Sequence, residues 1–157
     1  MKTDPDRSHT IEDGMLLDGL VGYNLKRAYV VMHEDFRRTL GEDGLNPRAF
    51  AVLAFAVQRQ GITQSEVART LGIERSGLVA IVDELERKDL VSRTPVPGDR
   101  RVQALHATNE GQRVFAAASR AVAAHEERLL SFLTEAEKRN LLKILQTIRN
   151  AGETGHD

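Results

Sequence analysis

Arginine residues occupy two places in this chain where a guanidinium group could recognise a polyanion. Arg75 opens a predicted helix shortly after the turn residue Gly72, and Arg100 and Arg101 follow Asp99 between two predicted strands. A guanidinium is planar and always charged, and it can bind a phosphate or the edge of a guanine through paired hydrogen bonds. This part of the sequence therefore indicates recognition of nucleic acid rather than catalysis.

Neighbouring residues have side chains or amides that suit the same partner. Ser76 and Gly77 lie in the first turn of the helix that begins at Arg75, where backbone amides attract a phosphate. Structural roles compete with this interpretation, because Ser76 also helps a helix to start and Arg75 could pair with a nearby carboxylate. The residues expected to contact DNA are Thr63, Gln64, Ser65, Glu74, Arg75, Ser76, Gly77, Arg93, Asp99, Arg100 and Arg101.

Glu74 stands directly before this helix, at the N-cap position, where Ser, Thr, Asp or Asn is preferred. Two interpretations remain open. The carboxylate either favours the positive end of the helix dipole, or it accepts a hydrogen bond from a cytosine amino group in the major groove. In both cases a negative charge close to DNA phosphates weakens binding.

The elements that must position these residues are mainly helices, with a small β-hairpin. Residues 63–66 and 134–137 are capping boxes, and Asn46 and Thr108 are good N-caps. We expect helices over residues 13–40, 47–60, 64–71, 75–88, 109–132 and 135–150, strands over 90–95 and 101–107 joined by a loop over 96–100, and a short strand between the second and third helices. The side chains expected to face inward include Val67, Ala68, Leu71, Leu78, Val79, Val82 and Leu85.

Composition excludes several classes of protein. The 157 residues carry a net charge of −1 and include no cysteine, so disulfides, thiolate metal sites and thiol-based sensing are excluded. No phosphate-binding glycine loop, nucleophile elbow, signal peptide or membrane-length apolar run is present, and the five histidines lack metal-binding spacing. We expect a cytoplasmic protein that is not an enzyme and needs no cofactor or metal.

Apolar residues on the first helix and the last two helices exceed what one small lobe can cover. Those of the last two helices expected to stay partly exposed in a monomer are Val114, Phe115, Ala118, Val122, His125 with its apolar neighbours, Leu129, Phe132, Leu141, Leu142, Leu145 and Ile148. Exposed apolar stripes of this size mark an interface. A two-fold homodimer through the terminal helices is the simplest arrangement that covers them.

Two segments resemble the MarR family of bacterial transcription regulators. One is GDRRVQALHATNEG, in which Asp99, Arg101, Thr108 and Gly111 match a D-x-R wing and a T-x-x-G helix start; the other is TQSEVARTLGIERSGLVAIVDELERKDLVSR, which is similar to the family's helix-turn-helix. The resemblance covers roughly residues 14–150. It implies a winged helix-turn-helix fold, a dimer on a pseudo-palindromic operator, and release by a small, often aromatic molecule. It also implies that Asp99 accepts a hydrogen bond from the second arginine while the other arginine reaches the minor groove.

The resemblance places the ligand site between the dimerisation helices and the winged lobe. An arginine beside aromatic walls would suit an aromatic acid or its coenzyme A thioester. Residues that could line such a site are Tyr23, Asn24, Arg27, Tyr29, His33, Phe36, Arg37, Phe50, Leu53 and Phe55. Ordinary core or surface packing is the competing explanation for each of them.

We therefore expect a ligand-responsive regulator, most often a repressor, that binds double-stranded DNA as a homodimer. The alternative is a winged-helix module that binds another protein and no DNA. The expected organisation is a flexible tail over residues 1–12, dimerisation helices over 13–45 and 109–151, a winged helix-turn-helix lobe over 46–108, and a tail over 152–157.

Overall fold

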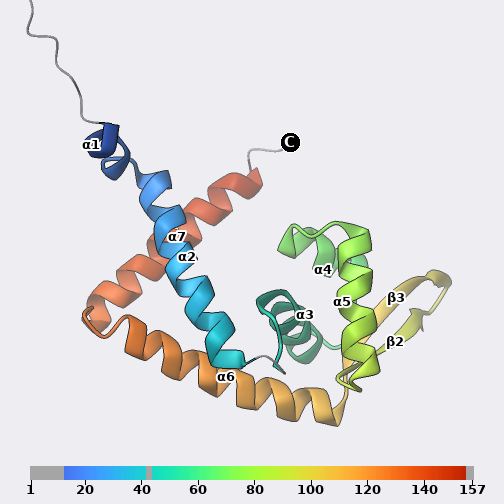
Figure 1. The fold of residues 1–157 in the computed structure, drawn as a ribbon. Coiled ribbons are helices and arrows are strands. Elements are labelled where there is room, and N and C mark those ends of the chain that lie inside the picture. Colours follow the sequence, from blue (N-terminus) through green and yellow to red (C-terminus); the bar gives the residue numbers. More distant parts are fainter. Residues whose placement is uncertain (1–12, 42–43, 155–157) are drawn as a thin grey trace, which may run out of the picture. The chain divides into compact units, whose positions relative to one another are not determined.

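The computed structural model describes residues 13–41 and 44–154, which form seven helices and three strands (Figure 1). The expected tail over residues 1–12 and the last three residues of the chain lie outside the described residues. The chain divides into two compact units, residues 1–35 and residues 36–157. The mainly helical fold with a small antiparallel sheet confirms the predicted fold class.

The single helix expected over residues 13–40 is wrong, because the structure has two helices there. Helix α1 (Asp13–Asp18) ends before Gly19, and α2 (Val21–Leu40) begins two residues later. Glycine in a helix interior costs about 1 kcal/mol relative to alanine. The side-chain amide of Asn24 donates to the carbonyl oxygens of Asp18 (2.8 Å) and Leu20 (2.9 Å), so it satisfies backbone groups at the break.

Three short helices and a two-residue strand follow. The helices begin where the sequence predicts, and the first of them ends two residues earlier than expected. Helix α3 (Pro47–Gln58) is capped by Asn46, whose side chain accepts from the amide of Ala49 at 2.9 Å. Strand β1 (Ile62–Thr63) leads into α4 (Gln64–Leu71), which has the predicted capping box. Gly72 closes α4 with a φ of 61°, and α5 (Arg75–Arg87) then begins. Helices α4 and α5 are the predicted helix-turn-helix.

The hairpin, which we call the wing, is formed by β2 (Val91–Val96) and β3 (Asp99–Ala107) and lies beside α5 (Figure 1). The sheet is antiparallel in the order β1-β3-β2. The expected five-residue loop is wrong: the turn is Pro97-Gly98 alone, with a φ of 89° at Gly98. Proline followed by a glycine of positive φ can turn the chain in two residues, so Val96 belongs to β2, and Asp99 and Arg100 belong to β3.

The core of the second unit lies between α3, α4, α5 and the sheet. Its fully buried side chains come from all of these elements and include Val52, Leu53, Val67, Leu78, Val82, Leu85, Val91 and Leu105. Burial of Leu78, Val82 and Leu85 confirms most of the predicted stripe of α5. Val79 departs from it, because 37% of that residue is exposed.

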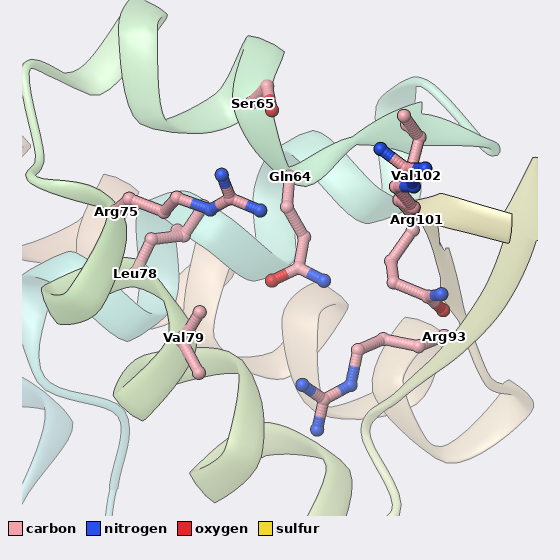
Figure 2. A pocket seen from close by; sticks show the side chains of 9 residues that line it. Gln64, Ser65, Arg75, Leu78, Val79, Arg93, Arg101 and Val102 are labelled. Atoms are coloured by element: carbon pink, nitrogen blue, oxygen red, sulfur yellow. The ribbon is translucent and has the colours of Figure 1, made fainter. Parts of the chain in front are cut away.

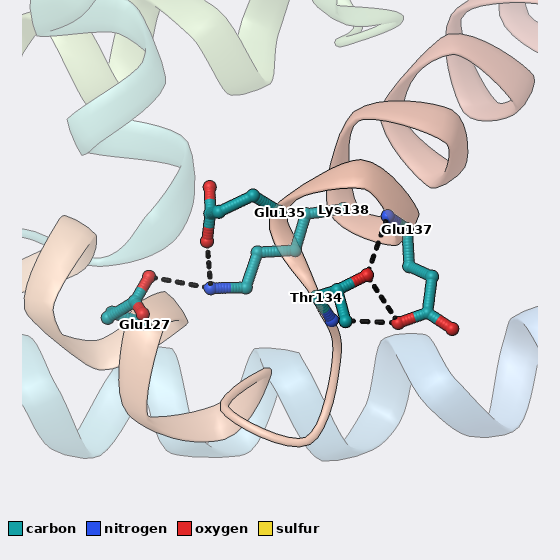
Figure 3. Close-up of polar contacts among 5 residues, drawn as sticks. All are labelled: Glu127, Thr134, Glu135, Glu137 and Lys138. Carbon is teal, nitrogen blue, oxygen red and sulfur yellow. Dashed lines mark hydrogen bonds and ion pairs between the residues drawn. The ribbon is translucent and has the colours of Figure 1, made fainter.

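Helices α6 (Asn109–Leu129) and α7 (Glu135–Thr154) complete the chain; α6 ends three residues earlier and α7 runs four residues further than expected. Thr108 caps α6 by accepting from the amide of Gly111 at 2.9 Å. The predicted capping box opens α7 (Figure 3), where the hydroxyl of Thr134 and the carboxylate of Glu137 bond each other's backbone amides. Lys138 bonds Glu127 of α6 (2.8 Å) and Glu135 (3.0 Å), which fixes the turn between the two helices.

The apolar residues of the terminal helices divide into two groups. Val114, Phe115 and Ala118 of α6 pack against the core but stay partly exposed, as expected. His125 is only 1% exposed, so the expectation that it stays partly exposed is wrong. Well-exposed apolar residues remain on α1, α2, the break between them, and α7, as expected. They are Leu16, Leu17, Leu20, Val21, Leu25, Tyr29, Val30 and Val31, with Leu141, Leu142, Ile144, Leu145 and Ile148. Phe132 precedes α7 and is 77% exposed.

Candidate nucleic-acid interface

A groove of about 460 Å³ lies between the helix-turn-helix and the wing. Its lining, which defines the term groove below, is Gln64, Ser65, Arg75, Leu78, Val79, Arg93, Arg101, Val102 and Gln103 (Figure 2). Five of these were predicted to contact DNA, from three separate parts of the sequence. The lining includes three arginines and no carboxylate. The structure therefore brings together residues that the sequence places almost forty positions apart.

Arg75 enters the groove from the first turn of α5. The backbone before it is extended at Glu74 (φ −61°, ψ 147°), and the Glu74 side chain makes no capping hydrogen bond, as the sequence suggests for a poor N-cap. Leu78 anchors the same turn in the core at 1% exposure. Ser76 and Gly77 are exposed beside Arg75. The start of α5 thus presents an arginine and free helical amides to solvent.

The wing has an irregular register at its outer end. Pro95 pairs with Gln103, whereas the next residue, Val96, pairs with Asp99, so residues 100–102 of β3 have no counterpart on β2. Proline cannot donate a ladder hydrogen bond and is therefore found at bulges and edges of sheets. Bulges re-aim side chains, and Arg100 and Arg101 lie in this bulge.

Hydrogen bonds within the wing hold the bulge in place. The carboxylate of Asp99 accepts from the backbone amide of Arg101 at 3.0 Å, and the side-chain amide of Gln103 donates to the carbonyl of Arg100 at 3.2 Å. Asp99 thus accepts from the second arginine of the pair, but through its main chain. Both guanidinium groups are exposed, and neither has a carboxylate partner among residues 13–41 and 44–154.

Arg93 differs from the other arginines of the groove. Its side chain is 24% exposed and bonds two carboxylates of α5, those of Asp83 and Glu86. Hydrogen bonds from Arg93 hold the pKa of Glu86 below its ordinary value, and the Glu86 carboxylate raises the pKa of Arg93. From the sequence, Arg93 was expected to contact DNA, and no pairing with Glu86 was predicted.

The start of α4 contributes through the capping box. The carboxylate of Glu66 accepts from the amide (2.9 Å) and hydroxyl (2.6 Å) of Thr63, and these bonds lower its pKa. Capping therefore accounts for Thr63, whereas Gln64 and Ser65 line the groove. Val79, Val102 and Gln103 also line the groove and were not among the predicted contact residues. Exposure of an apolar side chain inside a predicted helical stripe is a property of packing that spacing alone does not reveal.

The residues expected to line a ligand site fall in both units. In the first, the Tyr29 hydroxyl lies 3.2 Å from His33 Nδ1, and the Asn24 amide is engaged at the helix break. Tyr23 is half-buried, and Arg27 is exposed.

In the second unit, the ring of Phe36 packs against Phe50 (5.6 Å between centroids) and against His125 (6.5 Å), and Phe50 packs against Phe115 (5.5 Å). Arg37 is exposed, Phe55 is half-buried against the core, and Leu53 is fully buried. Phe115 and His125 were expected to stay partly exposed at an interface, and their helical spacing carries no signal for an aromatic cluster.

Within the part of the chain that the structure describes, no helix has the length and apolar character that crossing a bilayer requires. In the same residues, no group of three or more His, Asp or Glu side chains is arranged to hold a metal ion.

Comparison with known proteins identifies the family. A MarR-family sequence model matches residues 43–102. The putative transcriptional regulatory protein for the hcr operon of Thauera aromatica is 30% identical over 138 residues, which cover 87% of this chain and 83% of that protein.

Solved structures agree with the sequence relatives. The transcriptional repressor CouR bound to a 23-mer DNA duplex is 40% identical, with a TM-score of 0.80, over 85% of this chain and 94% of that chain. CouR from Rhodococcus jostii RHA1 bound to p-coumaroyl-CoA is 31% identical, with a TM-score of 0.76, over 84% and 93% of the respective chains. The chain thus belongs to the MarR family of winged-helix, DNA-binding transcriptional regulators, which is not a family of enzymes.

Proposed function

We propose that this regulator is a homodimeric repressor that binds a pseudo-palindromic operator and leaves it when an aromatic acid or its coenzyme A thioester binds. The observation that carries the proposal is the groove, where Arg75 from α5 and Arg101 from the wing line one surface together with polar residues of α4.

The start of α5 enters the major groove, where Arg75 reads a guanine edge. A bidentate contact of this kind contributes about 1–3 kcal/mol of discrimination. Ser76 and Gly77 present amides to a phosphate, and Gln64 and Ser65 contact the backbone from α4. At least one of Arg100 and Arg101 reaches the minor groove, since the bulge leaves both exposed and narrow minor grooves attract cationic side chains.

Two chains associate through the terminal helices. Exposed apolar residues on α2, such as Tyr29 (61%) and Val31 (58%), and on α7, such as Leu142 (58%), support this interface. A second copy presents the same residues, so a two-fold arrangement covers both sets. The two α5 helices then sit about 34–36 Å apart, which matches successive major grooves of B-form DNA.

The effector is an aromatic carboxylic acid or its thioester. CouR from Rhodococcus jostii RHA1 is bound to p-coumaroyl-CoA, and this chain is 31% identical to it over 84% of its own length. The aromatic cluster of Phe36, Phe50 and Phe115 offers ring surfaces for an aromatic group. An effector shifts the dimer away from the DNA-binding spacing only by its difference in affinity for the two states.

The proposal is tested with DNA that the protein itself selects. A 30-base-pair duplex is recovered from a randomised library, and binding is followed by fluorescence anisotropy with and without p-coumaroyl-CoA or p-coumarate. We expect a symmetric selected sequence, two chains per duplex and weaker binding with effector. Arg75→Ala should lower affinity for the selected duplex at least tenfold, in line with about 1–3 kcal/mol per contact. Equal affinity for selected and unrelated duplexes would contradict the proposal.

A further inference from the structure

We infer that Arg93 is a positioning residue, which holds the wing at a fixed angle to α5 through Glu86 and Asp83 and does not itself contact DNA. The inference rests on the proposed function, and it replaces the sequence-based expectation that Arg93 is one of the DNA-binding arginines.

The hydrogen bonds of Arg93 are the first support. Its Nε donates to Glu86 Oε2 at 3.0 Å, one terminal nitrogen donates to the same oxygen at 2.6 Å and also bonds Asp83, and its backbone amide donates to Glu86 Oε1 at 3.3 Å. The side chain extends from β2 toward α5 (Figure 2). A guanidinium held in this way has little freedom to turn toward a phosphate.

The local charge is the second support. Arg93 is surrounded by two carboxylates, so the cluster of these three side chains is negative overall and does not attract a polyanion. Arg75, Arg100 and Arg101 are exposed and have no such partner in the described part of the chain. Arg93, at 24% exposure, is therefore the member of the groove whose charge is already compensated within the protein.

The position of Arg93 along the wing is the third support. Val91 and its partner Ala107 are buried at the base of the hairpin, whereas Thr94 and Pro95 are exposed. Arg93 is thus the residue at which β2 changes from half-buried to exposed. The turn lies about 13 Å beyond it at about 3.3 Å per residue. A change of about 10° at Arg93 would therefore move the wing tip by roughly 2 Å, more than a hydrogen bond tolerates.

The decisive variant is Glu86→Gln, which removes a carboxylate next to a DNA-binding surface and keeps the size of the side chain. If Arg93 contacted DNA, losing this negative charge would leave affinity unchanged or raise it. If Arg93 positions the wing, both Glu86→Gln and Arg93→Ala weaken binding to the selected 30-base-pair duplex by about tenfold, as expected for losing hydrogen bonds between charged groups. The double variant should be no weaker than the worse single variant.

Salt dependence separates positioning from direct contact. Removing one phosphate contact from each chain of a dimer reduces the slope of log affinity against log salt by about 1.8. We expect Arg93→Ala to keep the slope of the unmodified protein while its affinity falls at every salt concentration. The matched controls are Arg113→Ala and Glu110→Gln, which break an exposed arginine–glutamate pair on α6 (2.8 Å) outside the groove. Both should bind DNA within about twofold of the unmodified protein.

Amide hydrogen exchange of the DNA-free protein gives a reading that does not depend on DNA. Exchange across residues 94–102 should become faster in Glu86→Gln and Arg93→Ala, with α6 unchanged and the melting temperature nearly so. Unchanged wing exchange, unchanged affinity in both variants, or a reduced salt slope in Arg93→Ala would each overturn the inference. If the unmodified protein selects no duplex, the proposed function fails instead. Amide hydrogen exchange then still tests whether Arg93 holds the wing against α5.

Discussion

Glu74 offers a direct test of how α5, the helix proposed to read DNA, begins. The N-cap backbone there is extended, as a cap requires, yet the side chain makes no capping hydrogen bond. Glu74→Asp keeps the charge and supplies a short side chain that caps well. We therefore expect Glu74→Asp to stabilise the protein and to leave DNA affinity within about twofold, because the field at the helix end is preserved.

The size of the stability change follows from measured caps. A good N-cap contributes about 1 kcal/mol relative to a side chain that does not cap. In a protein of this length that corresponds to a rise in melting temperature of roughly 2–4 °C. Thr134→Ala is the matched opposite, since it removes an existing cap at α7, away from the groove, and should lower the melting temperature by a similar amount.

Glu74→Gln isolates the charge, because it adds no cap. At about 10 Å in water a carboxylate repels one phosphate by about 0.4 kcal/mol, and screening at 0.1 M salt reduces this to roughly 0.15 kcal/mol. With two near phosphates on each half-site, a dimer should gain about 0.6 kcal/mol, or roughly threefold in affinity. The gain should disappear in 0.5 M salt.

Thermal melting and anisotropy titrations with the selected duplex measure these effects. If Glu74 instead accepts from a cytosine amino group, the shorter aspartate loses that contact. Affinity for the selected duplex then falls at least tenfold, and the preference at one base pair relaxes, as expected for about 1–3 kcal/mol per base contact. That result, or an unchanged melting temperature in Glu74→Asp, would refute the capping argument.

Three further predictions concern packing, assembly and acid stability. Gly111→Ala should lower the free energy of unfolding by about 2 kcal/mol in urea titrations, because the added Cβ would lie 1.9 Å from the Leu90 carbonyl oxygen; an unchanged midpoint would contradict it. Leu142→Lys should shift the protein toward monomer in size-exclusion chromatography without lowering helical content, since 58% of this residue is exposed. The pKa of Glu66 is lowered in the folded protein, so its ionised carboxylate stabilises the fold above the ordinary pKa of 4.5, and this stability is lost as pH falls through the lowered pKa. In Thr63→Val the melting temperature should therefore fall less steeply below pH 4.5 than in the unmodified protein.

Local signals in the sequence predicted the starts of the helices. Asn46, Thr63, Thr108 and Thr134 all cap the helices that follow them, because a cap depends on a side chain and on amides within three residues of it. The same locality explains the turn at Gly72, where a positive φ favours glycine. Features that depend only on residues a few positions apart in the sequence could be predicted without any knowledge of the fold.

Features that depend on pairing between distant segments could not be predicted. The wing bulge arises from the register between Pro95 and Gln103, and register is set by the whole hairpin. The partners of Arg93 lie seven and ten residues away on another element, so no helical or strand period indicates them. The helical spacing of His125 and Phe115 fits an interface stripe as well as it fits an aromatic cluster. The contacts of Phe36 with His125 and of Phe50 with Phe115 join distant elements, so spacing could not predict them.

The net charge of −1 predicts little about DNA binding, because the structure separates the charges that matter. On α5, Glu84 pairs with Lys88 at 3.1 Å, and Asp83 and Glu86 pair with Arg93. These pairs hold the carboxylates of α5 in contacts within the protein, and none of these carboxylates lines the groove. A polyanion approaching the groove would therefore meet Arg75 and Arg101, which have no carboxylate partner in the described part of the chain, even though acidic residues slightly outnumber basic ones in the whole sequence.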